Sequence, residues 1–257
     1  MVKITIIKSI IYQNPLNLAI FIFIFVLLLF FIHQWNIIHQ VYGLYFGNNI
    51  VINSGNVSSS FTKGQMSSVE RGYTYAVWVD KNNTIYFSAS HENGTKFSSP
   101  ITLSSNNTLA ISPQIIATEN GGVYVVWVDK NNSTGDSNIV FRGSNDNGKS
   151  FDRSVRLNRN PNQTSLSFAP QIAANEMGSV FVTWPENTLQ FKEILDGGNI
   201  LGRTISLNNH VVLPLSAQIV ATEKGNIYLA WAEKTDGLNN DTVLMFKRIS
   251  QYYFDRR

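Results

Sequence analysis

The sequence contains no cysteine and only four histidines. Without cysteine, neither a disulfide nor a thiolate metal site can form, so the core alone must stabilise the fold. His33 and His39 flank an apolar segment, whereas His91 and His210 are isolated, so no metal-type histidine cluster is evident. Gly-x-Ser-x-Gly, P-loop and dinucleotide-binding patterns are also missing, so nothing indicates the enzyme classes that depend on them.

Charged residues are scarce as well, at 14% of the 257 residues. Twenty Lys and Arg stand against 17 Asp and Glu, which gives a net charge of +3. Two of the basic residues, Lys3 and Lys8, precede a long apolar segment, and all 17 acids follow it. The remainder therefore has 18 basic and 17 acidic residues and is nearly neutral, so we expect no nucleic-acid partner.

That apolar segment lies near the N-terminus. Leu18–Ile32 holds 15 residues without a polar side chain, and apolar flanks extend it to about the 20 residues that cross a bilayer. No small-x-small cleavage site follows, which favours an uncleaved signal anchor over a signal peptide. No basic residue follows until Lys63. The positive-inside rule then predicts a single-pass cell-membrane protein with a cytoplasmic N-terminus and an extracytoplasmic remainder. Eight N-x-Ser/Thr sequons suit such an exported surface.

Four copies of a 16-residue pattern, aligned on tryptophans spaced 49, 57 and 47 residues apart, organise the rest of the chain. Each has a glutamine 13 residues before the tryptophan, a Glu-x-Gly turn, an aromatic residue three before it and an acid two after it. The tryptophans are Trp78, Trp127, Trp184 and Trp231. A period near 50 built from strand-like segments predicts a β-propeller.

Each repeat predicts four short strands, as in a propeller blade, but the fourth repeat has no fourth strand. The segment beginning at Ile50 matches the missing strand and lies 51 residues, one repeat length, before Ile101. We therefore expect an all-β fold: a four-bladed propeller closed by this N-terminal strand and preceded by one transmembrane helix. The alternative is an incomplete arc of a larger propeller, completed by another chain or lost through truncation.

These patterns divide the chain into five segments. They are a cytoplasmic N-terminus (1–14), a transmembrane helix (15–38), a juxtamembrane linker (39–49), the propeller (50–250) and a C-terminal tail (251–257).

Two segments carry a further pattern in the hairpin between the third and fourth strands. Ser144–Phe151 matches the Asp-box, Ser-x-Asp-x-Gly-x-x-Trp/Phe, and Ser90–Phe97 is a degenerate copy with Glu92 at the Asp position. On these motifs and their spacing, residues 50–250 resemble the sialidase-like (BNR-repeat) β-propellers.

That resemblance implies a structural Asp-box, whose Ser and Asp satisfy the turn and whose aromatic residue packs into the blade. The residues concerned are Ser144, Asp146, Gly148, Phe151, Ser90, Gly94 and Phe97. A sialidase would also need six blades, three convergent arginines and a Tyr–Glu nucleophile pair. The chain lacks the Arg-Ile-Pro motif that carries the first arginine, so no catalytic residue is carried over.

The acid two residues after each tryptophan is the leading candidate for a binding site. A closed ring would set four carboxylates at one level, and hard oxygen ligands suit Ca²⁺. The alternative is that each acid ends its strand and accepts hydrogen bonds from the following turn. The four are Asp80, Asp129, Glu186 and Glu233.

The repeated glutamines fall on the first strand of each blade, where they would line a central channel. They can bind a polar ligand there or hydrogen-bond neighbouring blades, as buried amides do. They are Gln65, Gln114, Gln171 and Gln218.

Together these features predict a membrane-anchored, non-catalytic module that binds a surface protein or a glycan. Two other classes stay open: a sialidase-type glycoside hydrolase, and a purely structural component of the cell envelope. The sequence leaves the oligomeric state undecided.

Overall fold

The computed structural model describes residues 26–27, 47–52, 61–105, 108–131, 133–159, 169–207, 214–223, 225–234 and 241–250. The chain divides into two units, Met1–Asn49 and Ile50–Arg257. Among the described residues, no helix is long and apolar enough to cross a membrane. The predicted span, 15–38, lies outside the described residues except for Val26 and Leu27, so the anchor stays a prediction.

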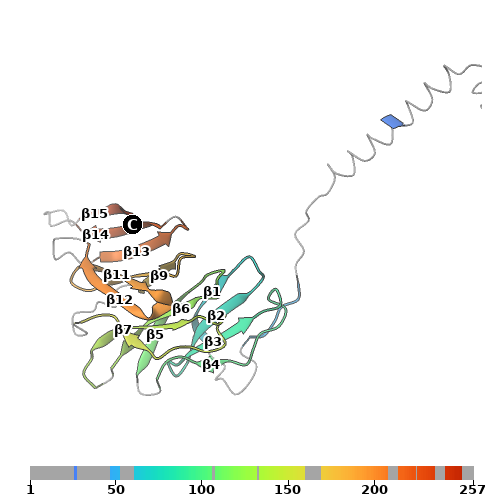
Figure 1. The fold of residues 1–257 in the computed structure, drawn as a ribbon. Coiled ribbons are helices and arrows are strands. Elements are labelled where there is room, and N and C mark those ends of the chain that lie inside the picture. Colours follow the sequence, from blue (N-terminus) through green and yellow to red (C-terminus); the bar gives the residue numbers. More distant parts are fainter. Residues whose placement is uncertain are drawn as a thin grey trace, which may run out of the picture. The chain divides into compact units, whose positions relative to one another are not determined.

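Four antiparallel sheets make up the second unit (Figure 1). The first two are β1 (Phe61–Ser68), β2 (Thr74–Asp80), β3 (Ile85–Ser90) and β4 (Ile101–Thr102), then β5 (Leu109–Ala117), β6 (Val123–Lys130), β7 (Ser137–Ser144) and β8 (Val155–Arg156). The last two are β9 (Gln171–Ala174), β10 (Val180–Pro185), β11 (Leu189–Leu195) and β12 (Ile200–Ser206), then β13 (Pro214–Ala221), β14 (Asn226–Lys234) and β15 (Thr242–Ser250). A short 3₁₀ turn, η2 (Asp196–Gly198), precedes β12.

The order of strands follows the repeat. In each sheet the strands pair in chain order, and the tryptophan strands β2, β6, β10 and β14 are central. Both faces of β6 and β10 are buried, as their continuous apolar sequences predict. The Glu-x-Gly turns also form as expected, because their glycines adopt positive φ angles of 77° to 94°. The four-sheet, all-β architecture is thus confirmed.

The core consists of three clusters, one at each contact between consecutive sheets. In each, a stacked aromatic pair of one sheet packs with the tryptophan of the next sheet. The pairs are Tyr75–Phe87, Tyr124–Phe141 and Phe181–Phe191, with ring centroids 6.1 to 6.2 Å apart, and their tryptophans are Trp127, Trp184 and Trp231. The repeated aromatic and tryptophan positions are therefore the two halves of one recurring contact.

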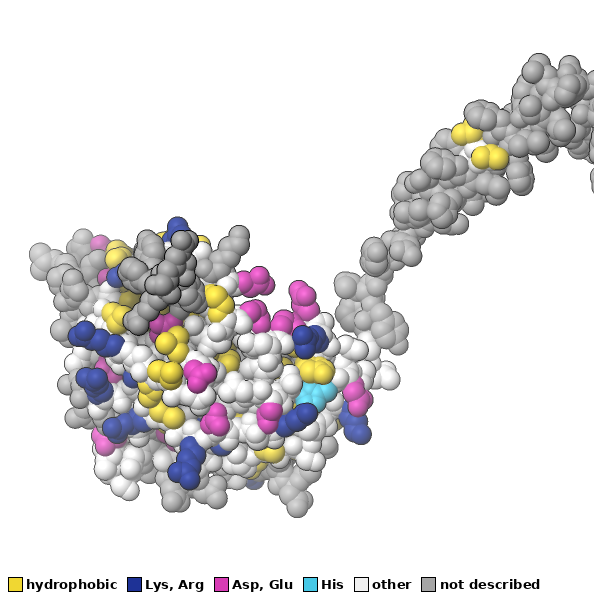
Figure 2. Space-filling view, viewed as in Figure 1, with side chains coloured by type: hydrophobic (Ala, Val, Ile, Leu, Met, Phe, Trp, Pro, Cys, Tyr) yellow, Lys and Arg dark blue, Asp and Glu magenta, His cyan; other side chains and the backbone are white. Residues whose placement is uncertain are grey.

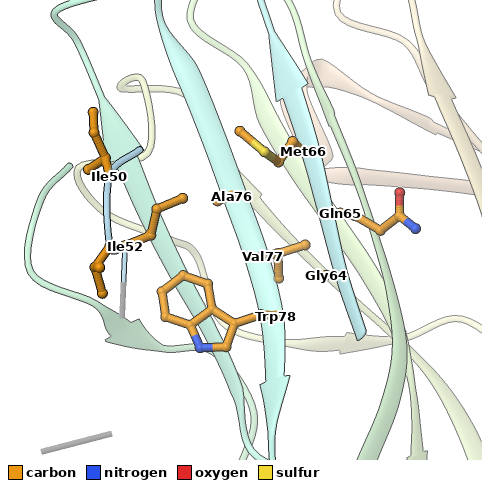
Figure 3. Close-up of a pocket in the computed structure, with 9 residues that line it drawn as sticks. Ile50, Ile52, Gly64, Gln65, Met66, Ala76, Val77 and Trp78 are labelled. Atoms are coloured by element: carbon orange, nitrogen blue, oxygen red, sulfur yellow. The ribbon is translucent and has the colours of Figure 1, made fainter. Parts of the chain in front are cut away.

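The predicted closing strand is not formed by the described residues. The fourth sheet has the three strands β13, β14 and β15, whereas Ile50–Ile52 lines a hollow of about 560 Å³ on the first sheet, beside Trp78 (Figure 3). Gly64 and Ala76 also line this hollow, and Ile50 and Val51 lie at its edge, 43% and 70% exposed. The expectation that Ile50 begins the last strand of the fourth blade is corrected accordingly.

Candidate functional site

The acids that follow the tryptophans act as local hydrogen-bond acceptors. The indole Nε1–H of Trp127 donates to Asp129 at 2.9 Å, and the equivalent bonds to Glu186 and Glu233 are 3.0 and 2.8 Å. Burial raises the pKa of Asp129, against the effect of the indole bond. These acids are each tied to their own tryptophan rather than to a common centre.

Asp80 differs from the other three. Its carboxylate accepts the backbone N–H groups of Asn82 and Thr84, both at 2.9 Å, and so closes the β2–β3 turn. Within the described ranges, no group of three or more His, Cys, Asp or Glu side chains is placed to hold a metal ion. The calcium site predicted from these acids therefore has no geometric support there.

The repeated glutamines lie on strands β1, β5, β9 and β13, which contact one another along the chain order. Gln65 and Gln218 are exposed, whereas Gln114 and Gln171 are half-buried. The amide of Gln171 donates to the carbonyls of Ala169 and Pro170 at 3.3 and 3.1 Å. Gln171 therefore bonds to the backbone of its own chain segment rather than to a neighbouring blade.

The Asp-box is a folded turn. Ser144 donates to Asp146 at 2.7 Å and accepts the N–H of Gly148 at 3.0 Å, while Ser150 donates to Asp146 through its N–H and its hydroxyl. Although slight desolvation opposes them, these bonds lower the pKa of Asp146 to about 2.

The aromatic residue of the box packs between the first two sheets. The ring of Phe151 meets Phe87 edge-on at 4.9 Å, and Phe151 packs against the core cluster there. In the degenerate copy, Ser90 accepts the N–H of Gly94 at 3.1 Å, and Phe97 is half-buried. Both boxes make backbone bonds of the kind that the resemblance implies.

The Glu-x-Gly turns form a feature that the sequence analysis treated only as hairpins. The backbone N–H of Glu70 donates to the carboxylate of Glu119, and that of Glu119 donates to Glu176 at 3.1 Å. Arg71 forms an ion pair with Glu119, with 3.8 Å between its Nε and the Oε2 of the carboxylate. The recurrence of glutamate eight residues before every tryptophan was the available signal.

These bonds link the first three sheets through their turns, so Glu70, Glu119 and Glu176 follow one another along one rim of the arc. Figure 2 shows acidic side chains gathered on the side where the β1–β2 hairpin lies. A carboxylate held by the N–H of a neighbouring blade has a fixed orientation, which is a property of binding and catalytic acids.

A polar cavity of about 210 Å³ opens beside these turns, between the second and third sheets. Tyr124 donates its hydroxyl to Asn145 at 3.4 Å, and the Asn145 amide donates to the carbonyl of Gly197 at 3.2 Å. Burial and the charge of Glu176 raise the pKa of Tyr124, which stays a neutral donor. The lining residues are Asn120, Tyr124, Asn145, Met177, Gly178, Asp196, Gly197 and Asn199.

Comparison with known proteins shows a likeness of structure without one of sequence. No known protein family matches the sequence, and no curated protein resembles it closely enough to be matched. The GH93 α-L-arabinofuranosidase of Fusarium graminearum, solved with arabinobiose, aligns with 78% of this chain and 66% of its own, at 9% identity and a TM-score of 0.56.

Two further glycosidases align less well. A GH43 endo-arabinanase from Bacillus licheniformis aligns over 72% of this chain and 71% of its own (14% identity, TM-score 0.45). The intramolecular trans-sialidase from Ruminococcus gnavus aligns over 72% of this chain and 42% of its own, at 12% identity and a TM-score of 0.45. The chain thus spans less than two thirds of the arabinofuranosidase and of the trans-sialidase. At such identities the likeness shows the fold alone, which is a β-propeller.

Proposed function

We propose that this chain is a carbohydrate-recognising β-propeller that binds a glycan at the rim of the arc that bears the Glu-x-Gly turns. The polar cavity between the second and third sheets carries this proposal. Its amides, phenol and carboxylate are donors and acceptors of the kind that sugar hydroxyls require, since each hydroxyl both donates and accepts. At about 210 Å³ it accommodates one sugar unit rather than an extended chain.

Glycoside hydrolysis is the second candidate. The likeness to an arabinofuranosidase at a TM-score of 0.56 favours it over a purely non-catalytic module. Hydrolysis needs two carboxyl groups, about 5–5.5 Å apart for retention of configuration or about 6.5–9.5 Å apart for inversion. Glu119 and Glu176 come from consecutive sheets and are oriented by backbone N–H donors, so they are the pair to examine.

The other roles considered from the sequence have less support. A surface-protein ligand and a purely structural role have no specific contact in their favour among the described residues. The transmembrane anchor, with the propeller held outside the cytoplasm, is part of the proposal and rests on the apolar segment and the distribution of basic residues.

The test is binding of the full chain, in mild detergent, to an array of arabinose- and sialic acid-containing glycans, with calcium and with chelator. We expect saturable binding that is lost in Asp196→Asn and Glu176→Gln. Glu92→Gln, a substitution of an exposed acid far from the cavity in sequence, is the matched control and should bind normally. Absence of saturable binding in both buffers would overturn the proposal.

Hydrolysis is read out in the same samples as release of reducing sugar. If the hydrolase is correct, Glu119→Gln and Glu176→Gln should abolish release, and at least one of them should still bind glycan. Binding without release in the unaltered chain supports the non-catalytic module.

A further inference from the structure

The four sheets contact one another in series, so the arc has two end faces (Figure 1). One belongs to the fourth sheet and we call it the β15 end face: Val220, Leu244 and Phe246, which are 59%, 79% and 68% exposed. Strand register places these side chains on the same face of the sheet as Tyr228 and its partner Arg248. Leu244 and Phe246 are neighbours on β15, and Val220 lies across β14 on β13. Exposed apolar side chains gathered on one face of a sheet indicate a surface that binds a partner.

The β15 end face repeats the chemistry of the internal contacts. Tyr228 and Phe246 stack with centroids 6.2 Å apart, as do the three buried aromatic pairs. Phe141 and Phe191 occupy the position of Phe246 in their sheets and are only 1% and 4% exposed, because the next sheet covers them. The covering element that the β15 end face lacks is therefore the tryptophan-bearing face of another blade.

The other end of the arc presents that kind of face. Here the β1 end face comprises Ile50, Val51 and Met66, which are 43%, 70% and 59% exposed, around the hollow that contains Trp78 (Figure 3). Met66 pairs with Ala76 just as Ile115 pairs with Val125. Ile115 is 8% exposed because the preceding sheet packs against it, whereas no sheet among the described residues precedes the one that carries Met66. The hollow of about 560 Å³ offers room for a side chain as large as Phe246.

The hydrogen bonds between the Glu-x-Gly turns also have a fixed direction from one sheet to the next. Between the first three sheets, the N–H of one turn glutamate donates to the carboxylate of the glutamate one sheet later, from Glu70 to Glu119 and from Glu119 to Glu176. A sheet placed before the first would donate to Glu70, and the turn of the fourth sheet offers the N–H of Glu223. Apolar packing and hydrogen-bond direction thus both match the β15 end face to the β1 end face.

We propose that two copies of this chain associate head to tail, with the β15 end face of one docked on the β1 end face of the other. Repeat proteins need polar terminal faces to remain soluble alone, whereas each end face here exposes three large apolar side chains. The two faces are different surfaces, so the contact is heterologous. Such contacts close into a ring when the geometry permits and otherwise form longer assemblies.

Crosslinking tests the proposal, because the chain has no cysteine of its own. Leu244→Cys and Met66→Cys are made in separately tagged full chains, mixed in mild detergent and treated with a short bis-maleimide. We expect a crosslinked product carrying both tags, and little from either variant alone. Met177→Cys, at a comparably exposed methionine in the turn of the third sheet, is the matched control and should not crosslink with either.

Two results would overturn the head-to-tail contact. Efficient crosslinking of Leu244→Cys with itself would show a symmetric contact between two β15 end faces. The second result uses a chain that carries both Leu244→Cys and Met66→Cys. If this chain forms an internal crosslink and keeps the mass of one chain, while the mixture of single variants gives no product with both tags, one chain closes on itself.

A charge placed in the contact gives an independent measurement. Phe246→Glu would bury an unpaired carboxylate, so the dissociation constant measured by analytical ultracentrifugation should rise by on the order of a hundredfold or more. Met177→Glu should leave it unchanged. A single-chain mass for the unaltered protein at tens of micromolar would overturn the proposal.

Discussion

The second and fourth sheets are built from two copies of the same repeat, but their equivalent residues differ in solvent exposure. Most of β7 is buried, whereas β15, the equivalent strand of the fourth sheet, is exposed along most of its length. Phe141 and Phe246 illustrate the difference, at 1% and 68% exposed, although both stack on an aromatic residue three positions before the tryptophan. The repeat therefore specifies the blade, while burial depends on whether another blade follows.

The largest expected effect tests this comparison directly. Phe141→Ala should lower the free energy of unfolding by about 3–5 kcal/mol, because it leaves a cavity between two sheets. Phe246→Ala should change it by no more than about 0.5 kcal/mol in dilute protein, because its ring is solvent-exposed. Urea denaturation followed by tryptophan fluorescence measures both. Equal losses would mean that Phe246 is as deeply packed as Phe141.

A smaller effect distinguishes the tryptophans. The indole N–H of Trp184 donates to Glu186, whereas that of Trp78 is buried without a hydrogen-bond partner. Replacement by phenylalanine removes ring area at both positions but removes a charge-assisted bond only at Trp184. Trp184→Phe should therefore cost about 1.5–3 kcal/mol more than Trp78→Phe in the same denaturation assay. A Trp78→Phe variant that loses as much stability would show that its N–H is satisfied in solution.

The smallest effect concerns the two Asp-boxes. Hydrogen bonds lower the pKa of Asp146 to about 2, from about 3.9 in an unfolded chain. A carboxylate with a lowered pKa in the folded state adds stability that is fully present above about pH 4 and is lost as the pH falls towards about 2. Asp146→Asn should flatten the fall of stability in that window. Glu92→Gln, at the equivalent position of the degenerate box, is the control.

Repetition made most of the fold predictable from the sequence. Glycine at a fixed distance before each tryptophan located four hairpins, and apolar runs around Trp127 and Trp184 located central strands buried on both faces. The segment at Ile50 was misplaced because strand-like sequence and repeat spacing do not reveal which of two apolar surfaces it covers. The hollow beside Trp78 decided that, and it arises from small side chains on two different strands.

The candidate site was less predictable. The acids after the tryptophans looked like ligands because they recur, but three of them bond to the indole two residues earlier and Asp80 closes its own turn, and neither role needs a ligand. The glutamates of the turns carried the same periodicity and were overlooked as ligands or catalytic acids, since a bond between the turns of consecutive sheets connects residues such as Glu119 and Glu176, 57 positions apart. A residue type that recurs at one position of each repeat indicates that the position matters, but the recurrence does not identify its hydrogen-bond partner.

By itself the sequence determined the four blades, their strand order, their turns and the aromatic and tryptophan positions of the core, because these depend on local patterns repeated at a regular interval. Only the tertiary structure decided which acids bond to indoles, which glutamates link the sheets, where Ile50–Ile52 packs, and which two faces of the arc stay uncovered. Those outcomes depend on the packing of segments that are distant in the chain, and no local pattern encodes it.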